Sequence, residues 1–270
     1  MGLIKRGFNL VLVGLIFMMT ACTSSSPQSD NSTESPDWQA TVTAFRDFVR
    51  GQNLTDDDIV NDIPDPQGDF DPNELLEYLP HLHLKPGYTL DYVYFEGAIS
   101  GEPFLYVRRI TDPPLDNAWA YLDQSEECEQ GANPTACHYW YFIETDGSEE
   151  GYFELVLLKM MGGQFYLFWH SCYDDVEIVA SEERLIELVN SIGRDDSSIE
   201  LTETQKREAL KIDPTPQITF GPGRVKVRVV WFTHWGGFTE TIYTISTHSL
   251  TKIIPSFSRA LVKYDCGIIY

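Results

Sequence analysis

The sequence predicts an α+β fold, a mostly antiparallel β-sheet with a few helices packed on one side. Most of the chain after residue 87 consists of apolar and aromatic runs bounded by turn residues, which is typical of strands. Because these runs follow one another directly, they favour antiparallel pairing. Residues 38–51 and 181–193 instead carry apolar side chains at helical spacing and end in glycine. The 270 residues, 43% of them hydrophobic, are enough to bury a core.

The first predicted elements of the folded part are helical. Residues 38–51 form a helix in this prediction, and their apolar positions share one face: Trp38, Val42, Phe45 and Val49. The acidic stretch that follows is interrupted by prolines. It predicts a loop and then a short helix over residues 74–78, with Pro72 near its start.

The next predicted elements are hairpins. Residues 88–97 and 102–110 are two apolar runs around a glycine-containing loop, which is typical of a β-hairpin. Residues 138–160 contain two aromatic runs separated by Asp146-Gly147, a strong turn signal. We therefore expect a second hairpin there.

The remaining segments alternate between the two types of element. Residues 162–173 predict a strand, and residues 181–193 predict a helix with Ser181 as its N-cap. A shorter helix is expected over residues 202–211. Three further strands are predicted over residues 224–235, 236–246 and 259–270.

Residues 1–21 have the features of a secretory signal. Lys5 and Arg6 give a positive start, and the run from Phe8 to Met19 is apolar apart from Asn9 and Gly14. This run is shorter than the roughly 20 residues that a membrane-spanning helix needs. The sequence therefore predicts export and cleavage of the leader.

The leader ends in Met19-Thr20-Ala21-Cys22, which resembles the lipobox of bacterial lipoproteins. The resemblance covers the leader alone, and leucine is the usual residue at the position of Met19. It implies that the Cys22 thiol receives a diacylglycerol, that the leader is removed before Cys22, and that fatty acyl chains such as palmitate anchor the protein. It also implies an extracytoplasmic location, on the outer membrane if the organism has one and otherwise on the outer face of the cell membrane.

Residues 22–37 predict a flexible tether, and residues 38–270 a single folded domain. The tether is rich in serine and has no apolar side chain to bury after Cys22. A flexible segment of this length reaches about 20 Å. The folded domain is therefore expected to stay near the membrane and to reorient freely.

The net charge of −22 is concentrated in the N-terminal half. Residues 22–150 contain 26 acidic and 5 basic residues, whereas residues 151–270 contain 15 acidic and 12 basic residues. Such a surface repels nucleic acid and anionic lipid headgroups. We therefore expect no nucleic-acid partner, and a membrane contact made through the lipid anchor.

Four cysteines remain after Cys22, namely Cys128, Cys137, Cys172 and Cys266. An even number of cysteines in an exported protein favours disulfides. We expect pairs between Cys128 and Cys137, which bracket a short loop, and between Cys172 and Cys266. Free buried thiols are the alternative. Zinc is disfavoured because no C-x-x-C motif occurs.

The histidines give weak candidates for a site. His81 and His83 form an H-x-H that would point to one face of a strand, as two metal ligands do. His170 and His234 each adjoin a tryptophan, and with Asp174 they would supply the base and carboxylate of a hydrolase. Neither G-x-S-x-G nor H-E-x-x-H is present. The alternatives are a surface segment between two prolines for His81 and His83, and half-buried structural histidines for His170 and His234.

One acidic segment is a weak calcium candidate. Asp69, Asp71 and Asn73 have the one-three-five spacing of a calcium loop, but Glu74 and Pro80 break the EF-hand pattern. Turn-forming residues are the alternative interpretation. We expect no other cofactor.

These observations favour a lipid-anchored, non-catalytic binding or accessory module of the cell envelope. The exposed aromatic side chains that consecutive aromatics imply, such as those over residues 139–142, suit ligand recognition. A hydrolase that uses a His170/His234 site and a structural envelope component are the alternatives.

Overall fold

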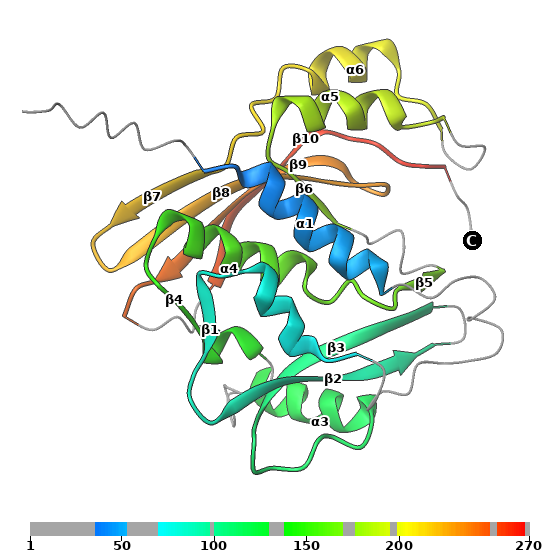
Figure 1. Ribbon diagram of the computed structural model, residues 1–270. Coiled ribbons are helices and arrows are strands. Elements are labelled where there is room, and N and C mark those ends of the chain that lie inside the picture. Colours follow the sequence, from blue (N-terminus) through cyan, green and yellow to red (C-terminus); the bar gives the residue numbers. More distant parts are fainter. Residues whose placement is uncertain are drawn as a thin grey trace, which may run out of the picture. The chain divides into compact units, whose positions relative to one another are not determined.

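The computed structural model describes residues 36–52, 70–97, 100–129, 138–169, 176–194, 199–248 and 253–267 (Figure 1). The chain divides into two compact units, Met1–Ser35 and Pro36–Tyr270, and every described residue belongs to the second. The predicted leader, Cys22 and nearly all of the tether lie outside the described residues. The second unit has an α+β fold, as predicted.

The described strands form three sheets in which every pairing is antiparallel. The five-stranded sheet has the order β10-β9-β8-β6, and β7 pairs with the other end of β8 beside β6. Its strands are β6 (Glu177–Val179), β7 (Gln217–Gly221), β8 (Arg224–Thr233), β9 (Gly237–Ser246) and β10 (Ile253–Val262). The two smaller sheets consist of β2 (Tyr88–Glu96), β3 (Ser100–Arg109) and β5 (Phe168–Trp169), and of β1 (Leu82–Leu84) and β4 (Ile143–Thr145).

Helices cover both faces of the five-stranded sheet, so the prediction that they pack on one side was wrong. The α-helices are α1 (Trp38–Gly51), α3 (Ala118–Glu129), α4 (Glu149–Met161), α5 (Glu182–Ser191) and α6 (Glu203–Ala209), and the short 3-10 helices are η1 (Pro72–Tyr78) and η2 (Tyr139–Phe142). Along β8, Val225, Val227 and Val229 pack with α1 and α4. Phe232 points to the opposite face and packs with α5. Figure 1 shows α5 and α6 on the other side of the sheet from α1 and α4.

Three hydrophobic cores hold these layers together. The main core lies between α1, α4, β2 and one face of the five-stranded sheet. A second core joins α5 and α6 to the other face of that sheet. A small third core lies between α3 and the strands β2 and β3. The chain thus packs its β2–β3 hairpin against helices on both faces.

Two helices agree closely with their sequence patterns. Helix α1 buries Val42, Phe45 and Val49, as predicted. Helix α5 begins at the predicted cap, where the Ser181 hydroxyl accepts a hydrogen bond from the backbone N–H of Arg184. After α5, Gly193 adopts a φ of 82°, which only glycine reaches without strain.

The hairpin predicted over residues 138–160 does not exist. Its first run forms η2 and β4, and its second run is the helix α4. Gly147, with a φ of 86°, makes the turn between β4 and α4, and Ser148 caps the helix. Helix α4 is buried on almost every side, so its sequence lacks the polar stripe that marks an amphipathic helix. A helix without that stripe resembles a strand in sequence.

Other boundaries also differ from the predictions. Of the strand expected over residues 162–173, residues 168–169 form β5, residues 162–167 are not in a strand, and residues 170–173 lie outside the described residues. The last strand, β10, begins at Ile253, and residues 263–267 lie outside it. Helix α3 was not predicted, because its apolar residues do not gather on one face. Among the described helices, none has the length and hydrophobicity that a membrane span requires.

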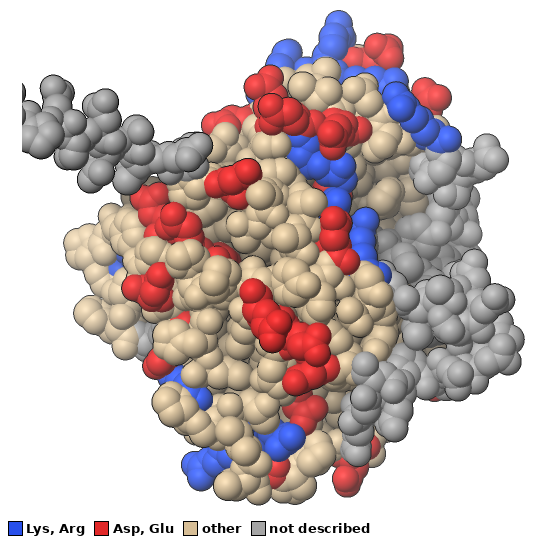
Figure 2. Space-filling view, in the orientation of Figure 1, with Lys and Arg blue, Asp and Glu red and all other residues tan. Residues whose placement is uncertain are grey.

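Surface charge follows the uneven distribution in the sequence. Figure 2 shows acidic side chains spread over the face that displays α1 and α4. Basic side chains gather at the end that carries α6, which contains Lys206 and Arg207. The surface in this view is therefore acidic around the main core and mixed around the second core.

Candidate functional site

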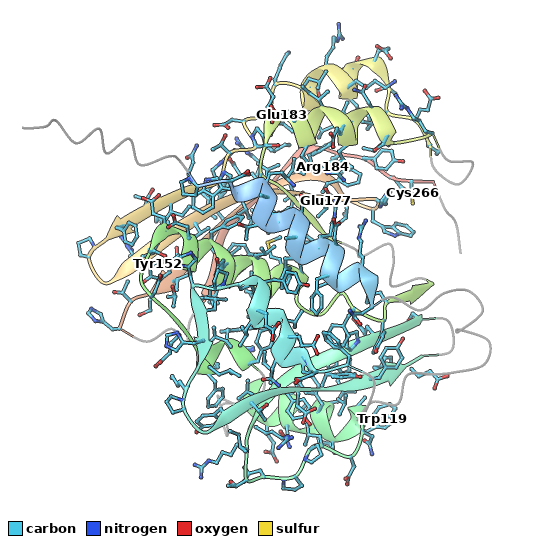
Figure 3. The ribbon with its side chains drawn as sticks, in the orientation of Figure 1. Trp119, Tyr152, Glu177, Glu183, Arg184 and Cys266 are labelled. Atoms are coloured by element: carbon cyan, nitrogen blue, oxygen red, sulfur yellow. The ribbon has the colours of Figure 1, made fainter. Side chains whose placement is uncertain are left out.

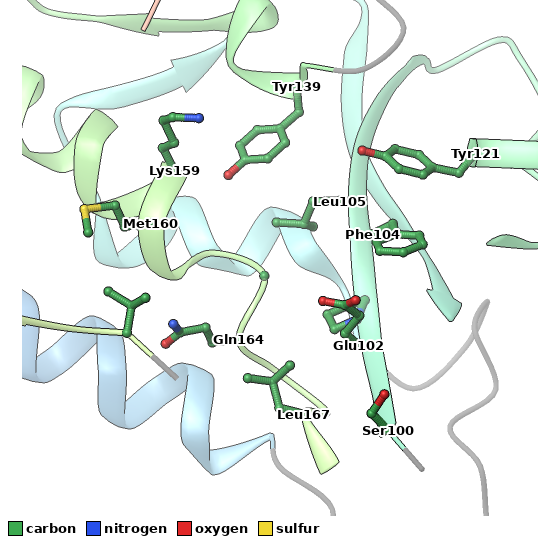
Figure 4. Close-up of a pocket in the computed structure, with 13 residues that line it drawn as sticks. Ser100, Glu102, Phe104, Leu105, Tyr121, Tyr139, Lys159, Met160, Gln164 and Leu167 are labelled. Atoms are coloured by element: carbon green, nitrogen blue, oxygen red, sulfur yellow. The ribbon is translucent and has the colours of Figure 1, made fainter. Parts of the chain in front are cut away.

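A cavity of about 380 Å³ lies between β3, α3, η2 and the C-terminal end of α4 (Figure 4). Its size falls within the range of small-molecule sites. Apolar groups supply much of its wall: Phe104, Leu105, Met160, Leu167 and Val176. Five polar side chains also line it, namely Ser100, Glu102, Tyr121, Lys159 and Gln164, together with the ring of Tyr139.

Lys159 is the chemically distinctive residue of this cavity. It lies in the last turn of α4, where the C-terminal end of the helix dipole favours a cation. Its Nζ lies 3.7 Å from the centre of the Trp140 ring. Within the described residues, no carboxylate lies at ion-pair distance from this ammonium group. A cation–π contact is therefore its main electrostatic support.

Burial lowers the pKa of Lys159 to about 8. Taking an ammonium group out of water disfavours its charged form, and in the described part of the chain no neighbouring anion offsets that cost. At neutral pH the side chain is still mostly protonated. It is an ammonium group that a bound anion would stabilise, and one that loses its proton readily.

Two tyrosines, Tyr121 and Tyr139, line the same cavity as Lys159. The Tyr139 hydroxyl donates a hydrogen bond to the carbonyl oxygen of Leu158, at 2.9 Å. Burial raises the pKa of Tyr139 and that of Tyr121, so both hydroxyls stay neutral at physiological pH. Figure 4 places Lys159 and Tyr139 toward one end of the view, and Gln164 and Ser100 toward the other. The described lining therefore offers the Lys159 cation, the Glu102 carboxylate, neutral hydroxyls and an amide.

Glu102 is the carboxylate that lines the cavity. It lies in β3 and is exposed, whereas Gln164 is buried. Leu167 and Val176 also line the cavity, and the residues between them in sequence include 170–175, which lie outside the described residues. The described residues of the cavity wall place Lys159 in its lining.

The predicted catalytic group is not brought together in the described structure. His170 and Asp174 lie outside the described residues. His234 follows β8, far along the chain from the Lys159 cavity, and its ring packs against Phe232 at 5.2 Å between centroids. Its carbonyl oxygen accepts a hydrogen bond from the backbone N–H of Cys266. The hydrolase interpretation stays a prediction.

The disulfide predictions concern residues that are mostly outside the described part. Cys137 and Cys172 are not described, and of Cys128 only the backbone in α3 is. Cys266 is buried and has a free thiol in the structure. Both predicted pairings therefore stay predictions.

Each histidine of the H-x-H motif lies beside a different carboxylate. His81 Nδ1 lies 2.8 Å from Asp146 Oδ2, and His83 Nε2 lies 3.3 Å from Glu144 Oε2. The carboxylate of Glu154 accepts a hydrogen bond from the backbone N–H of His81, at 2.9 Å. No group of three potential metal ligands occurs among the residues that the structure describes.

In the His81 cluster, which consists of His81, Asp146 and Glu154, the pKa of each side chain is shifted from its ordinary value. Its hydrogen bond to Asp146 raises the pKa of His81. Burial raises the pKa of Glu154 to about 7. Hydrogen bonds from Ser148 and His81 lower the pKa of Asp146 to about 2. These three groups link β1, the β4–α4 turn and the middle of α4, so the cluster fixes the start of α4.

Two of the three calcium candidates have structural partners. Asp71 caps η1 and accepts a hydrogen bond from the backbone N–H of Asn73, at 2.9 Å. The Asn73 side chain bonds both the N–H and the carbonyl oxygen of Leu90 in β2. Asp69 lies outside the described residues. These bonds fasten η1 to β2, and the calcium site stays a prediction.

Sequence reasoning missed Lys159. Its one signal is a single charged residue near the end of the apolar run Leu155–Leu158 and before Met160-Met161. Such a pattern also fits a lysine that extends into solvent. Comparison with protein-family models, curated proteins and solved structures found no match to this chain.

Proposed function

We propose that the chain is a lipid-anchored, extracytoplasmic binding protein that takes a small organic carboxylate in the Lys159 cavity. The observation that supports it best is the Lys159 ammonium group, which lies over Trp140 without a carboxylate partner in the described structure. A ligand carboxylate would supply the missing negative charge through a charge-assisted hydrogen bond. Binding would thereby offset part of the cost of burying the lysine.

The rest of the cavity suits the apolar body of such a ligand. Phe104, Leu105 and Leu167 present apolar surface, and Gln164 offers an amide for one further hydrogen bond. The volume of about 380 Å³ fits a molecule of roughly drug-fragment size. The overall negative charge opposes an anion at a distance, but salt screens that field beyond about 8 Å at physiological ionic strength. Contacts within the cavity therefore decide affinity.

The sequence of the leader supports the lipid anchor. Met19-Thr20-Ala21-Cys22 follows an apolar run of signal length, and a serine-rich tether comes next. Two or more acyl chains hold a protein firmly on a membrane, whereas a single chain does not. In this proposal the anchor keeps the domain at the envelope surface, with no nucleic-acid partner and with an envelope ligand as its target.

Calorimetric titration of the exported domain with benzoate tests the binding function. We expect saturable binding at one site, and at least about tenfold weaker binding for Lys159→Met, because a hydrogen bond to a charged group contributes about 1.5–3 kcal/mol. Lys85→Met is the matched control, since Lys85 also lies near an aromatic ring but outside the cavity. Equal affinity in wild type and Lys159→Met would refute the proposal.

Membrane fractionation tests the anchor separately. The variant Cys22→Ser removes the only thiol that the lipobox resemblance assigns to lipid. We expect the wild-type protein in the membrane fraction and the exported variant in the soluble fraction. Unchanged partitioning of the exported variant would show that Cys22 is not the anchor.

A further inference from the structure

We propose that Lys159 is also a covalent capture site for small aldehydes, which it binds reversibly as Schiff bases. This inference rests on the proposed function, because it places the reaction in the same cavity. It adds a reaction to that site and a second class of ligand, an apolar or aromatic aldehyde.

The position of the amine supports this inference first. Lys159 projects from α4, a helix that is buried along nearly its whole length and is therefore a rigid support. The side chain is itself half-buried, yet it lines a cavity that is open to solvent. A small molecule can thus reach an amine whose position is fixed by packing.

The chemical state of the amine supports it second. Nucleophilic attack needs the neutral amine, and desolvation in an apolar pocket is one way in which proteins activate lysine. Burial lowers the pKa of Lys159 to about 8. At neutral pH this gives on the order of 100-fold more neutral amine than an unperturbed lysine has.

Other described lysines lack this combination. Lys85 donates a hydrogen bond from Nζ to the carbonyl oxygen of Tyr141, at 2.8 Å. Lys206 lies 3.4 Å from Glu203 and 4.0 Å from Glu200, so its charge is stabilised. Neither lines the Lys159 cavity. The same protein therefore contains internal reference lysines.

The reaction balances without an oxidant or reductant. The neutral Nζ attacks the aldehyde carbon and forms a C–N bond, and the carbonyl oxygen takes a proton to give a carbinolamine. The nitrogen then loses a proton and forms the C=N bond, while the oxygen takes a second proton and leaves as water. One aldehyde and one amine thus give one imine and one water molecule. The protonated imine keeps a positive charge next to Trp140.

The lining of the cavity selects the class of aldehyde. Phe104 and Tyr121 stack on each other, with ring centroids 5.0 Å apart, and both line the cavity. Flat aromatic or unsaturated aldehydes match such walls better than polar sugars do. An aldehyde that also carries a carboxylate has two groups that compete for Lys159, so the plain aromatic aldehyde is the sharper probe.

The test treats the full exported domain with limiting benzaldehyde and cyanoborohydride at neutral pH, which fixes the imine as a stable secondary amine. Peptide mass mapping then measures labelling at each lysine over time. We expect labelling at Lys159 to be at least about tenfold faster than at Lys85 or Lys206. Its rate should rise with pH and level off above about pH 8.

Two outcomes separate this inference from the proposed function. Labelling of Lys159 no faster than that of Lys206, in a protein that binds benzoate, would overturn the inference and leave the proposed function standing. Failure to bind benzoate, with rapid labelling of Lys159, would overturn the proposed binding of carboxylates and leave the covalent site standing. Lys159→Arg adds a control that keeps a positive charge without a primary amine: we expect it to lose the fast label. Because the peptide mapping uses the wild-type protein, its result does not depend on whether any variant folds.

Discussion

Glu177 and Lys159 are both withdrawn from water, but the protein treats them differently. Glu177, in β6, is buried and receives two guanidinium groups: Arg46 Nη1 lies 2.6 Å away, and Arg184 donates from Nε at 2.5 Å and from Nη2 at 3.0 Å. Figure 3 shows Arg184 and Glu177 labelled close together beside α1. Among the residues that the structure describes, Lys159 has an aromatic ring as its partner instead of an opposite charge.

A second buried carboxylate follows the same rule as Glu177. Glu240, in β9, accepts hydrogen bonds from Arg228 at 2.6 Å and from Arg259 at 2.8 Å. Burial acts to raise the pKa of Glu240, but the Arg228 bond and both guanidinium charges outweigh it, so the pKa is lowered. The buried carboxylates of Glu177 and Glu240 are thus both paired with arginine side chains. The contrast with Lys159 supports the proposal that the partner of this lysine is a ligand.

The paired cluster should show the largest effect on stability. Glu177→Ala removes the buried anion that the half-buried Arg46 and Arg184 share, and we expect a loss of roughly 3–5 kcal/mol in the free energy of unfolding. Urea denaturation measures it. Glu183→Ala, an exposed position in the first turn of the same helix as Arg184, is the control and should cost less than about 1 kcal/mol. A loss below about 1 kcal/mol for Glu177→Ala would show that its arginine pairs do not stabilise the fold, and the contrast between Glu177 and Lys159 would no longer hold.

The His81 cluster should show an intermediate effect that depends on pH. The folded-state pKa of Glu154, about 7, is higher than its ordinary value of 4.5, so folded protein keeps this proton longer than unfolded protein. The raised pKa of His81 acts in the same direction. Stability should therefore fall by roughly 1–3 kcal/mol as pH rises from about 4.5 to about 7. Melting curves across this range test the sign.

Glu154→Gln sharpens that test. Glutamine keeps an acceptor for the His81 N–H but does not titrate, so most of the fall in stability with rising pH should disappear. The lowered pKa of Asp146, about 2, contributes stability that is lost only as pH falls through about 2, well below this range. A variant with the same pH slope as wild type would show that Glu154 does not carry the effect.

Lys159, which has no carboxylate partner among the described residues, should show the smallest effect on stability, and one of opposite sign. Lys159→Met removes a cation that burial disfavours and keeps an unbranched chain, so we expect a gain on the order of 1–2 kcal/mol at neutral pH. The wild type itself should gain stability as pH rises from about 8 to about 10.5, since unfolded protein holds the lysine proton longer. The gain of the variant should therefore shrink over this range. Destabilisation of Lys159→Met at neutral pH would show that the lysine supports the fold.

Much of the fold could be predicted because several helices and strands have one solvent-exposed face and one buried face. Helix α1 and strand β8 expose one side, so Val42 and Phe45, or Val225 and Val227, recur with the period of their element. Helix α4 could not be recognised in this way, because core surrounds it and no polar side chain marks the period. Gly147 and Ser148 then matched a hairpin turn as well as a helix start.

The candidate site was beyond sequence reasoning for a related reason. Lys159 becomes distinctive only when η2 places Trp140 under its Nζ and β3 closes the cavity, and these segments are separated along the chain. His81, by contrast, was noticed as part of an H-x-H, but the structure gives it carboxylate partners from the β4–α4 region. Residue type suggested chemistry at the histidines, whereas surroundings determine it at the lysine.

The most direct test of this account is a titration of the Lys159 side chain by NMR, with and without benzoate. The signal of the carbon next to Nζ reports protonation of this one amine. We expect a pKa near 8 in the free protein and a clear rise when benzoate binds, because the carboxylate stabilises the ammonium form. A pKa near 10.5 that benzoate leaves unchanged would contradict the account.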